Sequence, residues 1–261
     1  MRPRTDRKYL SLRNLQVCEV VLVLLFAALP ALAETETLVV RQNVSKPDRE
    51  ELALRLRTIT GWNELAFNSD GALRIGKAHV EGGSKAARDL LGRTISGNRI
   101  ILFEDASSRK DVIFCRVVSG KLDHAPDAEV YVVLIDFDDF QQVSGDKKAR
   151  AAFDVGWAVL HEIDHVVEDS EDPQTDIVGD CEDRINRMRV ELGLPIRSSY
   201  YFTLLPIKND SNLISRFVRL GFEQETGPTS KPRRYWLVWD AAVVGGLPDP
   251  SDITGALNRT N

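Results

Sequence analysis

The 261-residue chain lacks the features that mark several large classes of protein. Its 34 basic side chains are outnumbered by 39 acidic ones, and the formal net charge of −5 argues against nucleic acid as a partner. Internal repeats and low-complexity tracts are absent from the sequence. Beyond the first 33 residues, no apolar run is long enough to span a membrane. We therefore expect the function to depend on a few specific side chains.

The first 33 residues are predicted to be a secretory signal peptide. Five basic side chains among the first 13 residues precede a short apolar run at 20–29, and Ala31-Leu32-Ala33 fits an A-x-A cleavage site. An uncleaved N-terminal anchor is the alternative. In either case we expect an exported protein, periplasmic or secreted, with no membrane contact beyond this segment.

Residues 34–261, about 228 in all, have the size of one domain with its own core. Within them we expect 34–60, a helical region, and 211–261 to be peripheral. Two cysteines remain, Cys115 and Cys181, and in an oxidising compartment they could form a disulfide. The sequence leaves the oligomeric state open.

Two of the four histidines lie in the segment His161-Glu162-Ile163-Asp164-His165. On a helix, residues four apart lie one turn apart on the same face, so both imidazoles can bind one zinc ion. The carboxylate of Glu162 can then act as general base on the water that zinc activates. Because a pattern with three fixed positions also arises by chance, coincidence is the alternative.

The surroundings of the motif favour the metal site over coincidence. Apolar residues recur at helical spacing across 146–167, a start signal lies at Gly145-Asp146, and Pro173 follows the expected end. Further helices are predicted from Ser45 and Ser84. The remaining expectations are a hairpin at 65–75, strands at 99–104, 111–118, 129–137 and 234–238, and helices at 176–192 and 213–220.

The motif resembles that of the HExxH zinc metallopeptidases. Residues 191–197 (ELGLPIR), followed by Tyr200-Tyr201, are similar to a tail that follows the motif in predicted bacterial secreted or effector metallopeptidases. This resemblance implies an α+β, zincin-like fold with a small, mostly antiparallel sheet on a long motif helix and a second helix completing the metal site. It also implies zinc-dependent hydrolysis of peptide bonds in a peptide or protein substrate. Asp164 departs from the pattern, since many of these peptidases carry an uncharged residue there.

Catalytic zinc usually takes three protein ligands, which here are His161, His165 and one more. In glutamate-type zincins the third lies on the helix after the motif helix. Asp183 shares a helix face with Gly179 and with Asn186, which could support it from outside the ligand shell. We therefore predict Asp183 as the third ligand. Glu182, Asp180 and Cys115 are the alternatives, and an acid near a helix start can also be merely solvated.

Other polar side chains near the motif are expected to be structural. Asp164 would hold a neighbouring side chain or bind an arginine. Tyr200 and Tyr201 could donate to an oxyanion, but an ordinary packing role is favoured. The acidic loop 168–172 could hold calcium, but we expect it to be solvated.

Two other functions compete with a peptidase. The motif also resembles that of peptide deformylases, whose third ligand is an upstream cysteine, here Cys115. However, Cys115 lacks their E-G-C-L-S context, their Gly-rich segment is missing, and an export signal does not suit an enzyme of the ribosome. The second alternative is an inactive zincin-like binding module, with structural zinc closed by four protein ligands. Glu162 argues against it, since a structural site needs no general base.

Overall fold

The elements near the candidate site form largely where the hydrophobic pattern predicts them. The computed structural model describes residues 36–76, 79–123, 125–205, 216–227 and 230–246. The predicted signal peptide lies outside these residues. Those described belong to the unit Glu36–Asn261 and form six α-helices and three sheets, so the fold is α+β.

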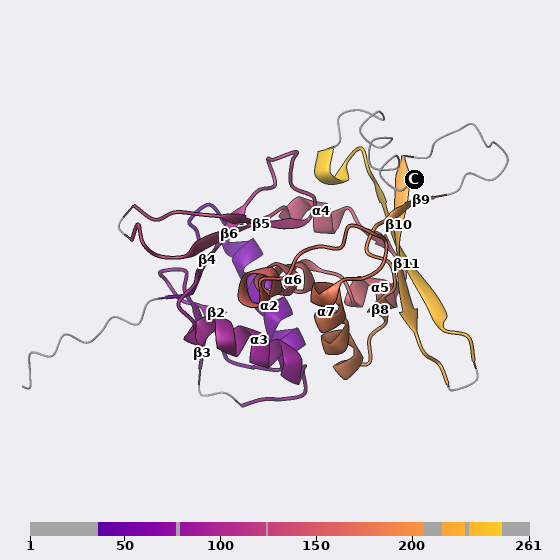
Figure 1. Ribbon diagram of the computed structural model, residues 1–261, viewed down its shortest axis with the longest axis horizontal. Coiled ribbons are helices and arrows are strands. Elements are labelled where there is room, and N and C mark those ends of the chain that lie inside the picture. Colours follow the sequence, from indigo (N-terminus) through magenta and orange to yellow (C-terminus); the bar gives the residue numbers. More distant parts are fainter. Residues whose placement is uncertain (1–35, 77–78, 124, 206–215, 228–229, 247–261) are drawn as a thin grey trace, which may run out of the picture. The chain divides into compact units, whose positions relative to one another are not determined.

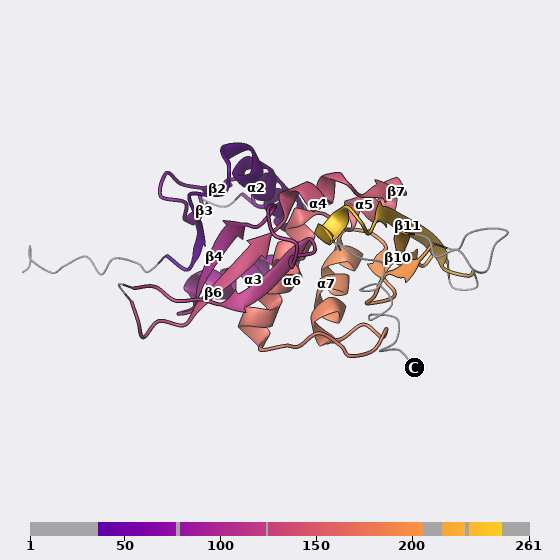
Figure 2. The ribbon, with the colours of Figure 1, turned by 90° about the horizontal axis from the view of Figure 1, so that it is seen from above.

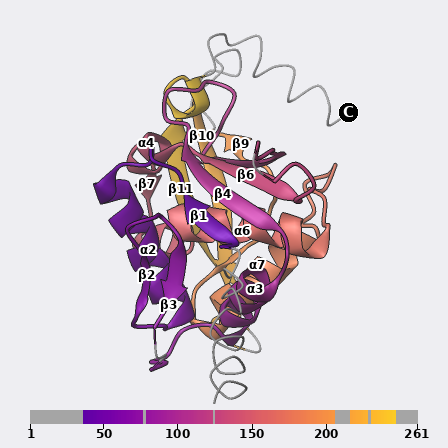
Figure 3. The same ribbon diagram turned by 90° about the vertical axis from the view of Figure 1, so that its left-hand side faces the viewer.

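The first sheet has the strand order β1-β4-β6-β5. Strands β1 (Leu38–Val40), β4 (Ile100–Asp105) and β6 (Val130–Ile135) are parallel, and β5 (Cys115–Ser119) is antiparallel to β6 at the end of the sheet. Figure 3 shows β1, β4 and β6 side by side. The mostly antiparallel sheet expected beside the motif helix is thus a mixed sheet. Two helices lie between β1 and β4, and this crossover returns the chain in the same direction.

Those crossover helices are α2 (Lys46–Thr60) and α3 (Lys85–Ser96), with the predicted hairpin β2 (Leu65–Phe67) and β3 (Leu73–Ile75) between them. Ser45 caps α2 by accepting from the backbone N–H of Asp48. The apolar face of α2 is buried against the motif helix. The described part of the segment 34–60, which was expected to be peripheral, is therefore part of the core.

The long motif helix predicted across 146–167 is two helices, α5 (Lys147–Ala151) and α6 (Val155–Glu168). Asp154 separates them because its carboxylate accepts from the N–H groups of Gly156 at 2.9 Å and Trp157 at 3.3 Å. A residue that caps a new helix in this way has non-helical backbone angles. The motif residues all lie on α6.

Helix α6 is surrounded by other elements on several sides. Figure 1 views it almost along its axis, with β5 and β6 above it and α3 below it. Helix α2 also packs against it. Helix α7 (Asp180–Glu191), which begins later than the predicted 176, lies beside it (Figure 2). The side chains of Trp157, Leu160 and Ile163 are buried in this environment. The candidate site thus lies on the helix with the largest share of buried residues in the described chain.

A second sheet forms around the hairpin β10 (Phe217–Gln224) and β11 (Arg233–Asp240). The helix predicted at 213–220 is wrong for its described part, since Val218, Leu220 and Phe222 are buried at the two-residue period of a strand. The strand predicted at 234–238 is confirmed. Short strands β7 (Ser144–Gly145), β8 (Ile196–Arg197) and β9 (Thr203–Leu204) complete the sheet.

The described part of 211–261 is also not peripheral, because this sheet has its own buried cluster and packs against α5. A short helix, α4 (Phe137–Gln141), follows β6. Cys115 and Cys181 are both free thiols. Among the described residues, no helix has the length and apolar character needed to cross a bilayer.

The cap at Asp154 gives a first prediction. Asp154→Ala should lower the free energy of unfolding by about 1–2 kcal/mol, because two N–H groups at the start of α6 lose their acceptor. Asp154→Asn keeps an acceptor oxygen and should stay within about 0.5 kcal/mol of wild type. Urea unfolding followed by tryptophan fluorescence measures both variants. Equal stability of the alanine variant and wild type would show that the cap does not hold α6.

Candidate metal centre

The two histidines of the motif face each other near the C-terminal end of α6. Their side chains are 11% and 10% exposed for His161 and His165 respectively. The two Nε2 atoms are 3.1 Å apart, and the ring centroids are 4.7 Å apart. The helical spacing thus brings the imidazoles together, as the sequence predicts.

The Nδ1 atom of each ring is held by a hydrogen-bond acceptor. His165 Nδ1 lies 2.8 Å from the carbonyl oxygen of Ser170, and His161 Nδ1 lies 3.2 Å from Glu182 Oε2. A carbonyl or carboxylate oxygen can only accept, so both Nδ1 atoms carry the hydrogen. In the neutral rings each Nε2 then presents a lone pair, and two lone pairs at 3.1 Å repel unless a proton or a metal cation lies between them.

A third acceptor reaches the same point. Asp172 Oδ1 lies 3.3 Å from His161 Nε2 and 3.0 Å from His165 Nε2. Tetrahedral zinc with bonds of about 2.0–2.1 Å separates its ligand atoms by about 3.3 Å. The three atoms therefore have the mutual spacing of three zinc ligands.

The charges around this point explain the pKa values of its members. Burial alone would raise the pKa of Asp172, but hydrogen bonds from His161, His165 and Tyr200 outweigh it and hold this pKa well below its usual range. Burial alone would lower the pKa of both histidines, but their hydrogen bonds to Asp172 help to raise it. The arrangement therefore favours a positive charge between these three side chains.

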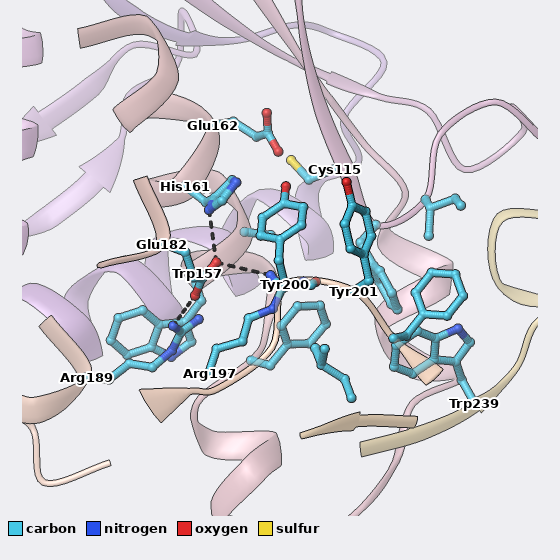
Figure 4. Close-up of a pocket in the computed structure, with 16 residues that line it drawn as sticks. Cys115, Trp157, His161, Glu162, Glu182, Arg189, Arg197, Tyr200, Tyr201 and Trp239 are labelled. Carbon is cyan, nitrogen blue, oxygen red and sulfur yellow. Dashed lines mark hydrogen bonds and ion pairs between the residues drawn. The ribbon is translucent and has the colours of Figure 1, made fainter. Parts of the chain in front are cut away.

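Glu182 belongs to a buried ion cluster and holds His161 from the side away from His165. Its side chain is 1% exposed; Oε1 pairs with Arg189 Nη1, and Oε2 lies 3.1 Å from Arg197 Nη1 (Figure 4). Burial would raise the pKa of Glu182, but the two arginines outweigh it and keep this pKa well below its usual value. An ionised Glu182 therefore fixes the hydrogen of His161 on Nδ1.

Glu162 lies beside β5. Its Oε2 accepts from the backbone N–H of Val117 at 2.9 Å, and Figure 4 shows its carboxyl group next to the thiol of Cys115. Burial raises the pKa of Glu162, although the positive charges of His161 and His165 oppose this. The carboxyl group is thus anchored through one oxygen, which leaves the other for a second partner.

The structure does not bring Asp183 to the histidines. Asp183 is exposed, and among the described residues no contact joins its side chain to His161 or His165. Successive residues on a helix point about 100° apart, so Asp183 faces away once Glu182 faces His161. Asn186 shares the face of Glu182, where it binds Arg189 and Arg197. Asp180, another predicted alternative, is also exposed.

Both cysteines lie near the site, but in different places. His161, His165 and Cys181 each bring one donor atom within 4.8 Å of the others, so this group could hold a metal. However, Cys181 Sγ contacts His161 at Nδ1, at 3.3 Å, rather than at Nε2. Burial raises the pKa of Cys181 to about 11, which keeps it a thiol at neutral pH. Cys115 lies beside Glu162, and burial raises its pKa as well.

The loop between α6 and α7 is fastened by the tyrosines and by Asp164. The hydroxyl of Tyr200 hydrogen-bonds Asp172, and that of Tyr201 donates to the carbonyl of Pro173 at 2.8 Å. Asp164 accepts from the hydroxyl of Ser170 in the loop at 3.2 Å. It also accepts a two-point hydrogen bond from Arg184 on α7, with Nε–Oδ1 at 2.8 Å and Nη2–Oδ2 at 2.6 Å. The predicted arginine partner of Asp164 is thus confirmed. These contacts fix the acidic loop that carries Asp172.

A cavity of about 310 Å³ opens beside His161 and Glu162. It is bordered by α6, by the residues before β5, by the segment from Arg197 to Phe202 and by the hairpin β10–β11. Glu182 and the two arginines of its cluster form part of the wall (Figure 4). A substrate entering this cavity would reach His161 and Glu162.

Comparison with protein-family models, with curated proteins and with solved structures gives no match for this chain.

Proposed function

We propose that this protein is an exported zinc-dependent metallopeptidase with a zincin-like fold. The observation that carries the proposal is the meeting of His161 Nε2, His165 Nε2 and Asp172 Oδ1 at 3.0–3.3 Å from one another, with Glu162 on the same helix. The predicted signal peptide supports export, and the cavity beside the site supports binding of a substrate. Asp172 replaces Asp183 in the proposed ligand set.

The donor set supports an open catalytic site over a closed structural one. Three protein ligands leave a fourth position for water or substrate, whereas structural zinc is closed by four protein ligands. Cys181 lies on the Nδ1 side of His161, so in this geometry it supports the ring rather than closing the shell. Cys115 lies next to Glu162, which disfavours the deformylase-like ligand set.

Two histidines and one carboxylate also suit Fe(II). Glu162 favours hydrolysis, because a buried carboxyl group of raised pKa next to the site suits a general base. When bound, zinc would lower the pKa of a water molecule and polarise the substrate carbonyl. Glu162 would take the proton of the attacking water through its free oxygen and pass it to the leaving amine, while Val117 holds its other oxygen.

The ligand assignment predicts the metal content of the purified protein. His161→Ala and Asp172→Ala should each weaken zinc binding by roughly a hundredfold or more, since each loses a direct ligand. Cys181→Ala should change the affinity by no more than about tenfold, and Asp183→Ala should not change it. Bound metal is measured by mass spectrometry, and affinity by competition with a chelating dye.

Two results would contradict this assignment. Zinc that is kept in Asp172→Ala but lost in Cys181→Ala would make Cys181 the third ligand. Iron in place of zinc, in protein purified without added metal and after reconstitution with both, would contradict the zinc-dependent reaction.

The proposed role of Glu162 as general base predicts how Glu162→Gln should behave. This variant should keep its zinc and lose peptide hydrolysis by roughly 10²–10⁴-fold, because it loses the proton acceptor and not a ligand. Cleavage is measured on a mixed library of internally quenched peptides, with Asp183→Ala as the control that keeps wild-type activity. Hydrolysis by Glu162→Gln at the wild-type rate would disprove the mechanism.

A further inference from the structure

The cavity beside the candidate metal centre is lined mainly by aromatic and aliphatic side chains. Figure 4 shows His161 and Glu162 on one side of it, and Tyr201 and Trp239 on the other. Its volume of about 310 Å³ equals roughly ten water molecules at about 30 Å³ each. The aromatic members of the lining, beyond those already named, are Phe114, Phe153, Trp157, Tyr200 and Phe202.

Apart from His161 and Glu162 of the candidate metal centre, the charged groups in the wall are already committed to one another. Glu182 pairs with Arg189 and Arg197. Arg189 also donates to Asn186 and to the carbonyl of Ala152, and Arg197 donates to the carbonyls of Ser199 and Tyr200. A charged substrate side chain would find no free partner among these groups, and its desolvation would be costly. The wall therefore favours an uncharged occupant.

One lining residue, Phe114, has a strained backbone. Its φ is +61°, and the N–H of Cys115 donates to the carbonyl of Ile113 at 2.7 Å, which closes a three-residue γ-turn around it. A bulky residue keeps such a conformation only where its surroundings enforce it, and such strain is concentrated at functional sites. The turn directly precedes β5, the strand that holds Glu162 through Val117.

Buried Asp139 enforces this turn. Its Oδ2 accepts from the N–H of Phe114 at 3.0 Å, and its Oδ1 accepts from the N–H of Gly245 at 3.0 Å. The ring of Phe114 then packs against three other aromatic rings. The centroid distances are 5.2 Å to Phe140, 5.0 Å to Phe153 and 5.3 Å to Trp239.

Two large apolar side chains at the cavity are themselves exposed. Ile113 is 37% exposed and Tyr201 is 41% exposed, and both belong to the lining. Ligand cavities of this kind are lined mostly by apolar side chains with a few polar groups that orient the ligand. Here the orienting groups would be those of the metal centre.

We propose that this cavity takes a large apolar side chain of the substrate, aromatic or leucine-like, next to the bond that is cleaved, and that Phe114 limits its depth. The inference rests on the proposed peptidase function for the cleavage reaction and on the residues that line the cavity for the selectivity. Burying such a side chain in place of alanine should favour the substrate by roughly tenfold to a hundredfold.

The test uses quenched peptides that are identical except at one residue beside the cleaved bond. In one series the residue before the bond is Phe, Leu, Ala, Glu or Lys, and in a second series the residue after it varies in the same way. In one of the series, kcat/KM should be roughly ten to a hundred times higher for Phe and Leu than for Ala, and lower still for Glu and Lys. Differences below about threefold in both series, with cleavage proceeding, would overturn the inference.

Two variants test the shape of the cavity, with one control. Ala158 lies on α6 and lines the cavity, so Ala158→Leu should reduce the preference for Phe over Ala by about tenfold. Phe114→Gly keeps a positive φ without strain, removes the ring and should shift the preference toward Trp. Ala86→Leu, on α3 and outside the cavity, should keep the wild-type preference. An unchanged preference in Phe114→Gly would remove its role in setting the depth.

A binding measurement separates this inference from the proposed function. Zinc-loaded Glu162→Gln, which keeps every apolar side chain of the lining and replaces one carboxylate by an amide of the same shape, is titrated by calorimetry with the Phe and Ala peptides of the selective series, or of both series if neither is cleaved. If the Phe peptide binds at least about tenfold more tightly than the Ala peptide, the cavity proposal is supported. This holds even if wild type cleaves neither peptide, a result that would contradict the peptidase proposal alone. Equal binding of both peptides overturns the cavity proposal even if wild type hydrolyses peptides.

Discussion

The buried carboxylate of Glu182 is the interaction on which the candidate site depends. It binds Arg189 and Arg197 and fixes the ring of His161. Arg189 also holds the backbone between α5 and α6, and Arg197 holds the backbone of Tyr200. One carboxylate therefore connects the motif helix, α7 and the segment that fastens Asp172. Removing one partner of such a buried pair leaves an uncompensated charge at a cost of about 3–5 kcal/mol, so these elements depend on one another.

Because of this cluster, the metal-binding atoms are already in place before a metal ion binds. With both Nδ1 hydrogens committed to Glu182 and to the backbone of Ser170, the two Nε2 atoms and Asp172 meet at one point, where a proton or a cation must lie between them. A bound metal ion would take the place of that proton. The residues that arrange the donors, Arg197 and Tyr200 among them, also line the cavity. The same residues therefore support both metal binding and substrate binding.

The sequence predicted the parts of the site that depend on local periodicity. The helical spacing of His161 and His165 and the core position of their helix follow from short-range patterns. The arginine partner of Asp164 follows only from its charge, since Arg184 lies on α7, 20 residues away. The sequence does not predict Asp172, because its position depends on how a loop folds back and an acid in an acidic loop looks solvated. Its one signal is the location just beyond the helix end and next to Pro173. The sequence of α7 alone favours Asp183 over Glu182, because the face of α7 that meets α6 is set by packing. The parallel pairing of β4 and β6 and the strand β10 likewise depend on contacts between distant segments.

X-ray absorption at the zinc edge of the zinc-loaded protein tests the central claim most directly. The account predicts a first shell of nitrogen and oxygen at about 2.0–2.1 Å, with the scattering of two imidazoles and no sulfur. A sulfur neighbour at about 2.3 Å would place a cysteine in the shell and contradict the open site of two histidines and Asp172. A shell without imidazole would contradict the metal centre itself.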